Sequence, residues 1–195
     1  MELPDGTMRK KRRVYDLPGH AHELTFSCYH LRPYLRSERS RQWVIDAIDR
    51  ARTAHGFQLW AFVVMSTHVH LLVFRPPRDG PLGVPVVLQS IKQSVSRRAA
   101  AWVRAHAPER ISDFEVREPG GKKRFRFWQE GGGYDRNIFS AEAAWNSVGY
   151  MHQNPVEAGL CAEPEDWAWS SARWYARRGD ALLACDGRPP PIMPR

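Results

Sequence analysis

Four stretches of the chain have the pattern of apolar and polar positions that is typical of β-strands. His22–Tyr29 alternates apolar with polar side chains, and Phe57–Met65 is dense in aromatic and β-branched residues. His68–Phe74 is a third such stretch, and the connection of only two residues before it predicts a tight antiparallel hairpin with the second. Phe125–Gln129 is expected to be the fourth strand, followed by a flexible glycine turn at 131–133.

Three longer stretches repeat their apolar residues every three or four positions, which predicts amphipathic helices. The first is Ser40–Ala54 and the second is Val86–His106. The third is Ala141–Asn154, where the hydroxyl of Ser140 can cap the first turn. We expect Pro155 to end this helix, because the residue before a proline is disfavoured in the α conformation.

These elements give the order β-α-β-β-α-β, followed by one more helix. The order predicts an α+β, ferredoxin-like fold, with one antiparallel sheet, helices on one face and an additional C-terminal helix. The expected organisation is a basic N-terminal arm at 1–15, one folded domain at 16–178 and a proline-rich tail at 179–195.

Composition narrows the class of protein. The 195 residues include 8 Trp and are 43% hydrophobic, which is enough for one domain with its own core. No apolar segment is long enough to span a membrane, and the amino terminus lacks the apolar stretch of a signal peptide. We therefore expect a soluble cytoplasmic protein without a membrane partner. The 3 Cys include no CxxC pair, so the sequence indicates neither a disulfide framework nor a thiolate zinc site.

The charge balance favours a nucleic-acid partner, because 29 Lys and Arg stand against 21 Asp and Glu, a net charge of +8. The basic residues form three groups, which we expect to contact DNA. They are Arg9, Lys10, Lys11, Arg12 and Arg13; Arg97 and Arg98; and Lys122, Lys123, Arg124 and Arg126. The first group can equally be a solvated tail. The aromatic residues interleaved with the third fit either base stacking or an ordinary half-buried strand.

Two histidines, His68 and His70, lie one residue apart on a predicted strand. Alternate residues of a strand share a face, so both imidazoles project from one side while Val69 and Leu71 project from the other. Two neutral imidazoles at this spacing can share a divalent metal ion. They can also be unrelated hydrogen-bonding residues, so a metal site requires a third ligand from elsewhere in the chain.

The third predicted helix offers polar residues that can complete such a site. At about 100° per residue, Ser147, Tyr150 and Asn154 fall on one arc with Ala143, away from the apolar stripe that includes Trp145. Considered separately, the tyrosine can be a partly buried residue with its hydroxyl in water, and the asparagine can be a helix-terminal cap. The small residues on the same arc indicate a face that closely approaches another part of the molecule.

These two regions resemble the motifs of a known family. His68-Val69-His70 matches the H-U-H motif, in which U is a bulky apolar residue, and YMHQNPVEAGL at Tyr150–Leu160 resembles the tyrosine signature of the single-tyrosine HUH transposases. Among these IS200-like transposases, the chain most resembles the REP-associated tyrosine transposases of bacteria. FWQEGGGYDRNI at Phe127–Ile138 and DWAWSSARWY at Asp166–Tyr175 resemble further blocks of the family, and the resemblance extends over Leu24–Tyr175.

The resemblance implies a function and a set of site residues. The function is single-strand DNA nicking and rejoining through a covalent 5′-phosphotyrosine, on hairpin or palindromic repeat DNA. In the family, two histidines and a polar residue four positions after the tyrosine bind one Mg²⁺ or Mn²⁺, and here these ligands are His68, His70 and Asn154. The nucleophile falls on Tyr150. Whether the protein is a monomer or a homodimer, and whether Tyr150 serves the metal site of its own chain, stays open.

The sequence departs from the family pattern before Tyr134, where three glycines replace a bulky residue. Tyr134 is therefore a competing nucleophile, although we expect a structural or DNA-contacting role for it. Gln153 is a competing metal ligand. We expect His152 to pack or to contact a phosphate, and Lys92 can orient a phosphate or a water molecule.

Two other functions are alternatives. Rolling-circle replication initiators of the HUH class share the order of histidines and tyrosine, so a nickase of that type is the nearest enzymatic alternative. A domesticated descendant that binds DNA or RNA without cutting it is the alternative outside catalysis.

Overall fold

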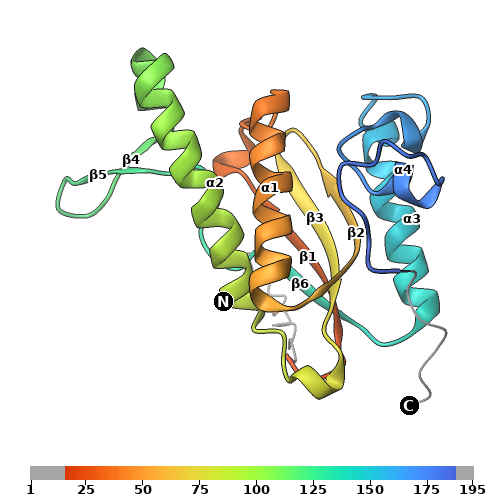
Figure 1. The fold of residues 1–195 in the computed structure, drawn as a ribbon. Helices are drawn as coiled ribbons and strands as arrows, with labels where there is room; N and C mark the ends of the chain where they lie inside the picture. The colour runs from red at the N-terminus through yellow and green to blue at the C-terminus, as the bar shows by residue number, and fades with distance from the viewer. Residues whose placement is uncertain (1–15, 188–195) are drawn as a thin grey trace, which may run out of the picture.

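The computed structural model describes residues 16–187, and its centre is a four-stranded antiparallel sheet with the strand order β2-β3-β1-β6 (Figure 1). Its strands are β1 (Ala21–Ser27), β2 (Gln58–Val64), β3 (His68–Phe74) and β6 (Tyr134–Ile138). The helices are α1 (Glu38–His55), α2 (Val84–His106), α3 (Ala141–Glu157) and the short α4 (Ala172–Tyr175). The 3-10 helices are η1 (Tyr29–Leu31), η2 (Pro77–Asp79), η3 (Pro108–Phe114) and η4 (Pro164–Asp166). This order confirms the predicted α+β, ferredoxin-like fold.

Parts of the predicted organisation lie outside the described residues. These are the basic arm at 1–15, with Arg9, Lys10, Lys11, Arg12 and Arg13, and the end of the proline-rich tail at 188–195. Within residues 16–187, every helix is too short or too polar to cross a membrane.

Short polar side chains and one glycine set the ends of the helices. The hydroxyl of Ser37 accepts a hydrogen bond from the Ser40 amide at 3.2 Å, so α1 begins earlier than its apolar pattern indicates. Gly56 ends α1 in the left-handed conformation with φ 63°, which glycine adopts without a steric penalty. The hydroxyl of Ser140 accepts from the Ala143 amide at 3.1 Å, which confirms the predicted cap of α3.

The prediction of the fourth strand at Phe125–Gln129 is wrong. Part of that stretch belongs to β5 (Lys123–Phe125), which pairs with β4 (Glu115–Arg117) in a separate hairpin arm. The rings of Phe127 and Trp128 are buried in the core beneath α1 and α2. Their alternation with polar residues therefore reflects packing, and these two rings are not available to stack on bases.

The fourth strand of the sheet is β6, which directly follows the glycine turn and reads YDRNI. It pairs with β1 from Tyr134 opposite Thr25 to Ile138 opposite Ala21. Only the last of its residues is buried, so the strand lacks the apolar pattern that identified the other three.

Helix α3 passes through Pro155 and ends at Glu157, contrary to the expectation that the proline ends it. Pro155 stands in the last turn, where the missing amide removes only one backbone hydrogen bond, and the residue is buried. The chain leaves the helix two residues later, and Gly159 then takes a left-handed conformation with φ 66°.

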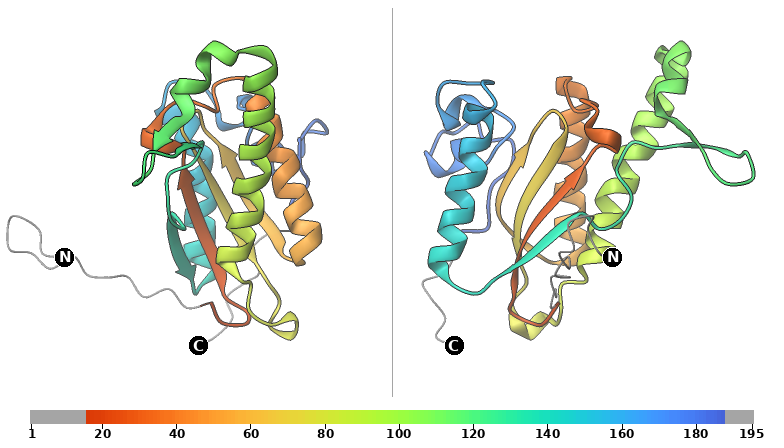
Figure 2. Two further views of the ribbon diagram at one scale, coloured as in Figure 1. Left: turned by 90° about the vertical axis from the view of Figure 1, so that its left-hand side faces the viewer. Right: turned by 180° about the vertical axis from the view of Figure 1, so that it is seen from behind.

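The two faces of the sheet are covered differently. Helices α1 and α2 pack on one face, over an apolar core that includes Leu24, Phe26, Val69, Leu71 and Val73. Helix α3 packs on the other face, over a smaller apolar cluster along β2 and the end of β3, which also includes Ala21 of β1 and Ile138 of β6. Seen from behind, α3 lies to one side and no helix crosses β1 and β6 (Figure 2). This second face therefore combines a covered half with an open half.

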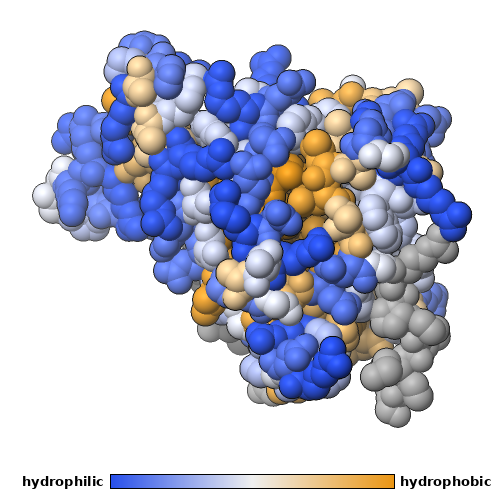
Figure 3. All heavy atoms as spheres, viewed as in Figure 1, coloured by the Kyte–Doolittle hydropathy of each residue, from blue (hydrophilic) through white to orange (hydrophobic). Residues whose placement is uncertain are grey.

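The surface seen in Figure 3 is mostly hydrophilic over α2 and over the β4–β5 arm, and apolar residues gather in the seam beside α1. The arm extends away from the sheet, as Figure 1 shows.

Candidate metal and tyrosine site

Strand β3 places both histidines on the face that α3 covers. Val69, Leu71 and Val73 belong to the core beneath α1 and α2, so the alternate residues His68 and His70 project to the opposite side, as the sequence predicts. The two imidazole rings lie edge to face, with 4.7 Å between their centroids. His70 is 5% exposed, and His68 is half-buried.

Two threonine hydroxyls fix the orientation of the rings. Thr25 Oγ1 lies 2.8 Å from Nδ1 of His70, and Thr67 Oγ1 lies 2.9 Å from Nδ1 of His68. Each Nδ1 atom therefore has a neutral hydrogen-bond partner, and each Nε2 atom is the ring nitrogen that can bind a further group. A second hydrogen bond of this kind is how proteins hold a histidine that binds a metal.

Nε2 of His70 is buried and has no hydrogen-bond partner among the described residues. An unpaired polar atom in a dry environment costs free energy, so such an atom in a folded protein needs an explanation. A divalent cation supplies one, because neutral imidazole nitrogen is a common metal ligand. The histidine pair thus fits a metal ion.

Burial keeps both histidines neutral. Desolvation, with a smaller contribution from the neighbouring His68, lowers the pKa of His70 to about 4. Desolvation also lowers the pKa of His68. A neutral imidazole retains the lone pair that a metal requires, so both side chains are in the ligating form at neutral pH.

Tyr150 lies on α3 and faces this pair. Its ring centroid is 6.1 Å from that of His70, with an interplanar angle of 88°. The side chain is 53% exposed, so the phenol stands at the border between the histidines and solvent. The structure therefore brings together a histidine pair and a tyrosine that are separated by eighty residues of sequence.

Asn154 lies one turn further along α3. Its Nδ2 donates a hydrogen bond to the backbone carbonyl of Tyr150 at 2.8 Å, which leaves the amide oxygen as the atom that can bind a cation. Gln153, the competing ligand, is exposed. Within residues 16–187, no three His, Cys, Asp or Glu side chains form a group that fits a metal ion. A third ligand from the described residues would therefore be of another type, such as an amide.

A polar network that the sequence pattern did not predict ties α3 to the sheet beside the histidines. Ser147 Oγ donates to the buried carboxylate of Glu23 on β1 at 2.9 Å. Arg136 on β6 donates to Ser147 Oγ at 2.7 Å and forms an ion pair with Glu23. Ser147 is on the arc whose small residues indicated a close approach. Trp145, expected in the apolar stripe, is instead 39% exposed.

The predicted DNA-contacting cations of the middle group lie away from this site. Arg97 and Arg98 are on α2, which covers the opposite face of the sheet. Arg98 pairs with Asp46 of α1 at 2.5 Å, and Arg97 donates to the Gln93 carbonyl of its own helix at 3.3 Å.

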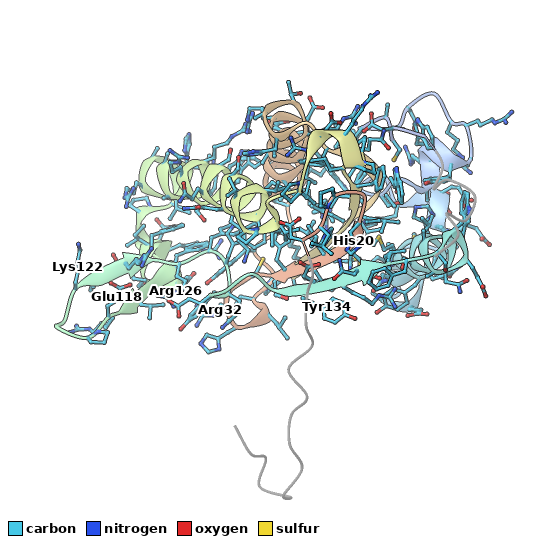
Figure 4. All side chains as sticks on the ribbon, turned by 90° about the horizontal axis from the view of Figure 1, so that it is seen from below. His20, Arg32, Glu118, Lys122, Arg126 and Tyr134 are labelled. Carbon is cyan, nitrogen blue, oxygen red and sulfur yellow. The ribbon has the colours of Figure 1, made fainter. Side chains whose placement is uncertain are left out.

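The cations of the third group lie on and beside the β4–β5 arm, most of them next to carboxylates. Figure 4 shows Lys122, Glu118 and Arg126 in a row, with Arg32 nearby. Arg124 and Arg126 pair with Glu118 at 3.1 Å and 3.5 Å, while Lys123 Nζ lies 2.7 Å from a carboxylate oxygen of Glu115. Lys122 is exposed near the tip of the arm.

Two residues whose roles the sequence left open have structural roles. His152 contacts Ser171 Oγ through Nε2 at 2.9 Å, on the side of α3 away from the histidine pair, and packs against Tyr175. Lys92 donates from Nζ to the Gly131 carbonyl at 2.7 Å and lies over the ring of Phe26. Lys92 therefore holds the glycine turn from the α2 side of the sheet.

Together, the fold and the site define a class of protein. It is a ferredoxin-like α+β domain in which one sheet face carries a histidine pair and a C-terminal helix presents a tyrosine to that pair.

Comparison with solved structures finds the same fold in another protein. A REP-associated tyrosine transposase, solved bound to a REP hairpin, has the same fold, with a TM-score of 0.63 and 20% sequence identity over 96% of this chain and 100% of that one. A presumed transposase from Deinococcus radiodurans R1 matches with a TM-score of 0.42 and 18% identity, over 75% of this chain and 97% of that one. No protein-family model and no curated protein sequence matches the chain.

Proposed function

We propose that this protein is a metal-dependent DNA transposase of the single-tyrosine HUH type, related to the REP-associated tyrosine transposases. In this proposal it nicks and rejoins single-stranded DNA next to a hairpin. The observation that supports it best is the unpaired Nε2 of buried His70, which lies beside His68 and faces the ring of Tyr150.

The proposed chemistry assigns a role to each group. His68, His70 and Asn154 would hold one Mg²⁺ or Mn²⁺, which when bound withdraws charge from the oxygens of a phosphate. Tyr150 attacks the phosphorus in line, the bond from its Oη to phosphorus forms, and the bond from phosphorus to the 3′ oxygen breaks. The 3′ oxygen leaves with the electron pair and takes up a proton, and solvent beside the exposed phenol accepts the proton of Tyr150.

The same geometry supports rejoining. The covalent 5′-phosphotyrosine retains the energy of the broken bond, so attack by a 3′ hydroxyl reverses the step without a nucleotide cofactor. The network of Ser147, Glu23 and Arg136 supports action within one chain, because it holds α3 against its own sheet.

DNA is the proposed partner because of the chain's net charge of +8 and the group of cations on the arm. The carboxylates on the arm order its cations in the absence of DNA. On binding, phosphates would compete with these carboxylates for Lys123, Arg124 and Arg126. The exposed Lys122 needs no such exchange.

The test is covalent capture of a labelled DNA hairpin with single-stranded flanks, in the presence of Mn²⁺, read on a denaturing gel. The wild-type protein is expected to form a protein–DNA adduct, and Tyr150→Phe is expected to lose it entirely because the nucleophilic oxygen is gone. Tyr134→Phe is the matched control and is expected to keep the adduct.

Other outcomes would separate the alternatives. Loss of the adduct in Tyr134→Phe and its retention in Tyr150→Phe would move the nucleophile to Tyr134 and contradict the assignment. Tight hairpin binding without any adduct, with Mn²⁺ bound or not, would favour a domesticated binding protein. An adduct on single-stranded DNA irrespective of a hairpin would favour a replication-initiator type of nickase.

A further inference from the structure

Tyr134 lies in the same cross-strand row as the histidine site. It pairs with Thr25 across β1 and β6, and Thr25 pairs with His70 across β1 and β3. The Thr25 hydroxyl contacts His70, so Thr25 points to the histidine face. Directly opposed residues of antiparallel strands project to the same side, so Tyr134 does as well. Two strand spacings put its Cα about 10 Å from that of His70.

The backbone that precedes Tyr134 is held in place. Gly133 has φ +81°, and a Cβ at this position would lie 2.2 Å from the carbonyl oxygen of Thr25. Only glycine allows β6 to approach β1 so closely, which explains why no bulky residue precedes the tyrosine here. Lys92 binds the Gly131 carbonyl at 2.7 Å and fixes the other end of the turn.

The Tyr134 side chain is presented outward on the open half of this face. It is 43% exposed, and Figure 4 shows it on the side of the sheet away from α1 and α2. Arg136, two residues further along β6, shares the face, and its side chain is 39% exposed. The guanidinium of Arg136 is held by Glu23 and Ser147, so the group that this part of the face offers to a nucleobase is the aromatic ring.

We propose that Tyr134 is a stacking platform for the base of an unpaired nucleotide next to the phosphate that is cut. This proposal rests on the proposed function, because it places the ring beside a strand that enters the histidine site. Its ligand is a base of single-stranded DNA, without a preference for one base, since every base presents a π-face to the ring. The phenol oxygen has no part in bond breaking.

The test measures DNA affinity by fluorescence anisotropy in the Tyr150→Phe background, which prevents a covalent step. One probe is a hairpin with a short oligothymidine extension, and the other is the same hairpin with a blunt end. Tyr134→Leu is expected to weaken binding of the extended probe about 5- to 150-fold, the range for one lost base–aromatic stack. It is expected to leave binding of the blunt probe within about twofold.

Two variants serve as controls. Tyr134→Phe keeps the ring and is expected to bind the extended probe like the parent protein. Phe139→Leu removes another exposed aromatic side chain just beyond the end of the same strand and is expected to change neither affinity. If Tyr134→Leu folds normally by thermal melting and binds both probes like the parent, or loses affinity for both equally, the platform is contradicted.

An abasic scan of the extension locates the stacked base. Removing the stacked base is expected to weaken DNA binding by the Tyr150→Phe parent, which keeps Tyr134. It is expected to leave DNA binding by the variant that also carries Tyr134→Leu unchanged. The absence of any such position would also contradict the proposal. If the wild-type protein forms no adduct but Tyr134→Leu still weakens binding of the extended probe alone, the proposed function is refuted and the stacking role of Tyr134 is supported. If the wild type forms an adduct on Tyr150 but Tyr134→Leu binds both probes like the parent, the proposed function is supported and the stacking role is refuted.

Discussion

The two faces of the central sheet are built from the same strands and have opposite chemistry. Beneath α1 and α2, residues such as Leu24 and Leu71 are fully buried among apolar neighbours. On the other face, His70 is buried with an unpaired nitrogen, and Glu23 is a buried carboxylate in a polar network. The first face stabilises the fold, whereas the second retains polar groups at a cost in free energy, which is typical of a functional site.

Neighbouring residues of β3 give the largest expected contrast. His70→Leu removes a proposed metal ligand and an unpaired buried nitrogen, together with the hydrogen-bond partner of Thr25. We expect adduct formation to fall at least about a thousandfold, and the free energy of unfolding to change by about 1 kcal/mol or less, because the two effects on stability oppose each other. Leu71→Ala should lower the free energy of unfolding by about 2–5 kcal/mol, with adduct formation per folded molecule retained. Urea unfolding and the adduct gel measure the two quantities. Equal losses of activity in both variants would remove the distinction between the faces.

The pH dependence of stability tests the polar groups around α3. Burial lowers the pKa of His152 to about 4, below its unfolded value of about 6.5. Between these two pH values the unfolded chain binds more protons than the folded chain. The contribution of neutral His152 to the free energy of unfolding is therefore complete above about pH 6.5 and is lost as the pH falls toward 4. From about pH 7.5 to pH 5, the wild type should lose about 2 kcal/mol more than His152→Gln does. Urea unfolding at both values checks this, and parallel losses would contradict it.

A further expected effect concerns the hydroxyl that contacts Nδ1 of His70. Thr25→Val keeps the shape of the side chain and removes the partner of Nδ1, so we expect Mn²⁺ affinity to fall about 10- to 100-fold by calorimetric titration. Thr53→Val, at a surface threonine of α1, is the control and should bind Mn²⁺ like the wild type. An unchanged affinity in Thr25→Val would mean that the hydroxyl does not orient a metal ligand.

The elements that could be predicted from the sequence are those whose buried residues form a recognisable apolar pattern along the chain. The bounds of β3 were predicted correctly, and those of α1, α2 and β2 to within two residues. The two helices carry a regular apolar stripe, and the two strands are nearly continuous runs of apolar residues. Strand β6 escaped prediction because most of its residues lie outside the core. Phe127 and Trp128 led to the wrong prediction of a strand, because aromatic residues that pack in the core beneath a helix give the same sequence pattern as a half-buried strand.

Some residues of the candidate site could be predicted from the sequence, and others could not. The shared face of His68 and His70 follows from strand geometry alone. The approach of Tyr150 was expected from the small residues on its arc of the helix and from the resemblance of its motif. Thr25, Glu23 and Arg136 escaped prediction, because their roles depend on the register between β1, β3 and β6, which no local pattern encodes. Gly133 carried a local signal, since a glycine in or beside a strand often marks a close approach of another backbone.

The central claim is that the two Nε2 atoms of the histidine pair hold a divalent cation in front of Tyr150. A crystal structure of the protein with Mn²⁺, with the ion located by its anomalous scattering, tests this most directly. The account predicts one strong peak within coordination distance of Nε2 of both His68 and His70, on the side of the Tyr150 ring. A protein saturated with Mn²⁺ that shows no peak there, or shows its peak at another group of residues, would contradict it.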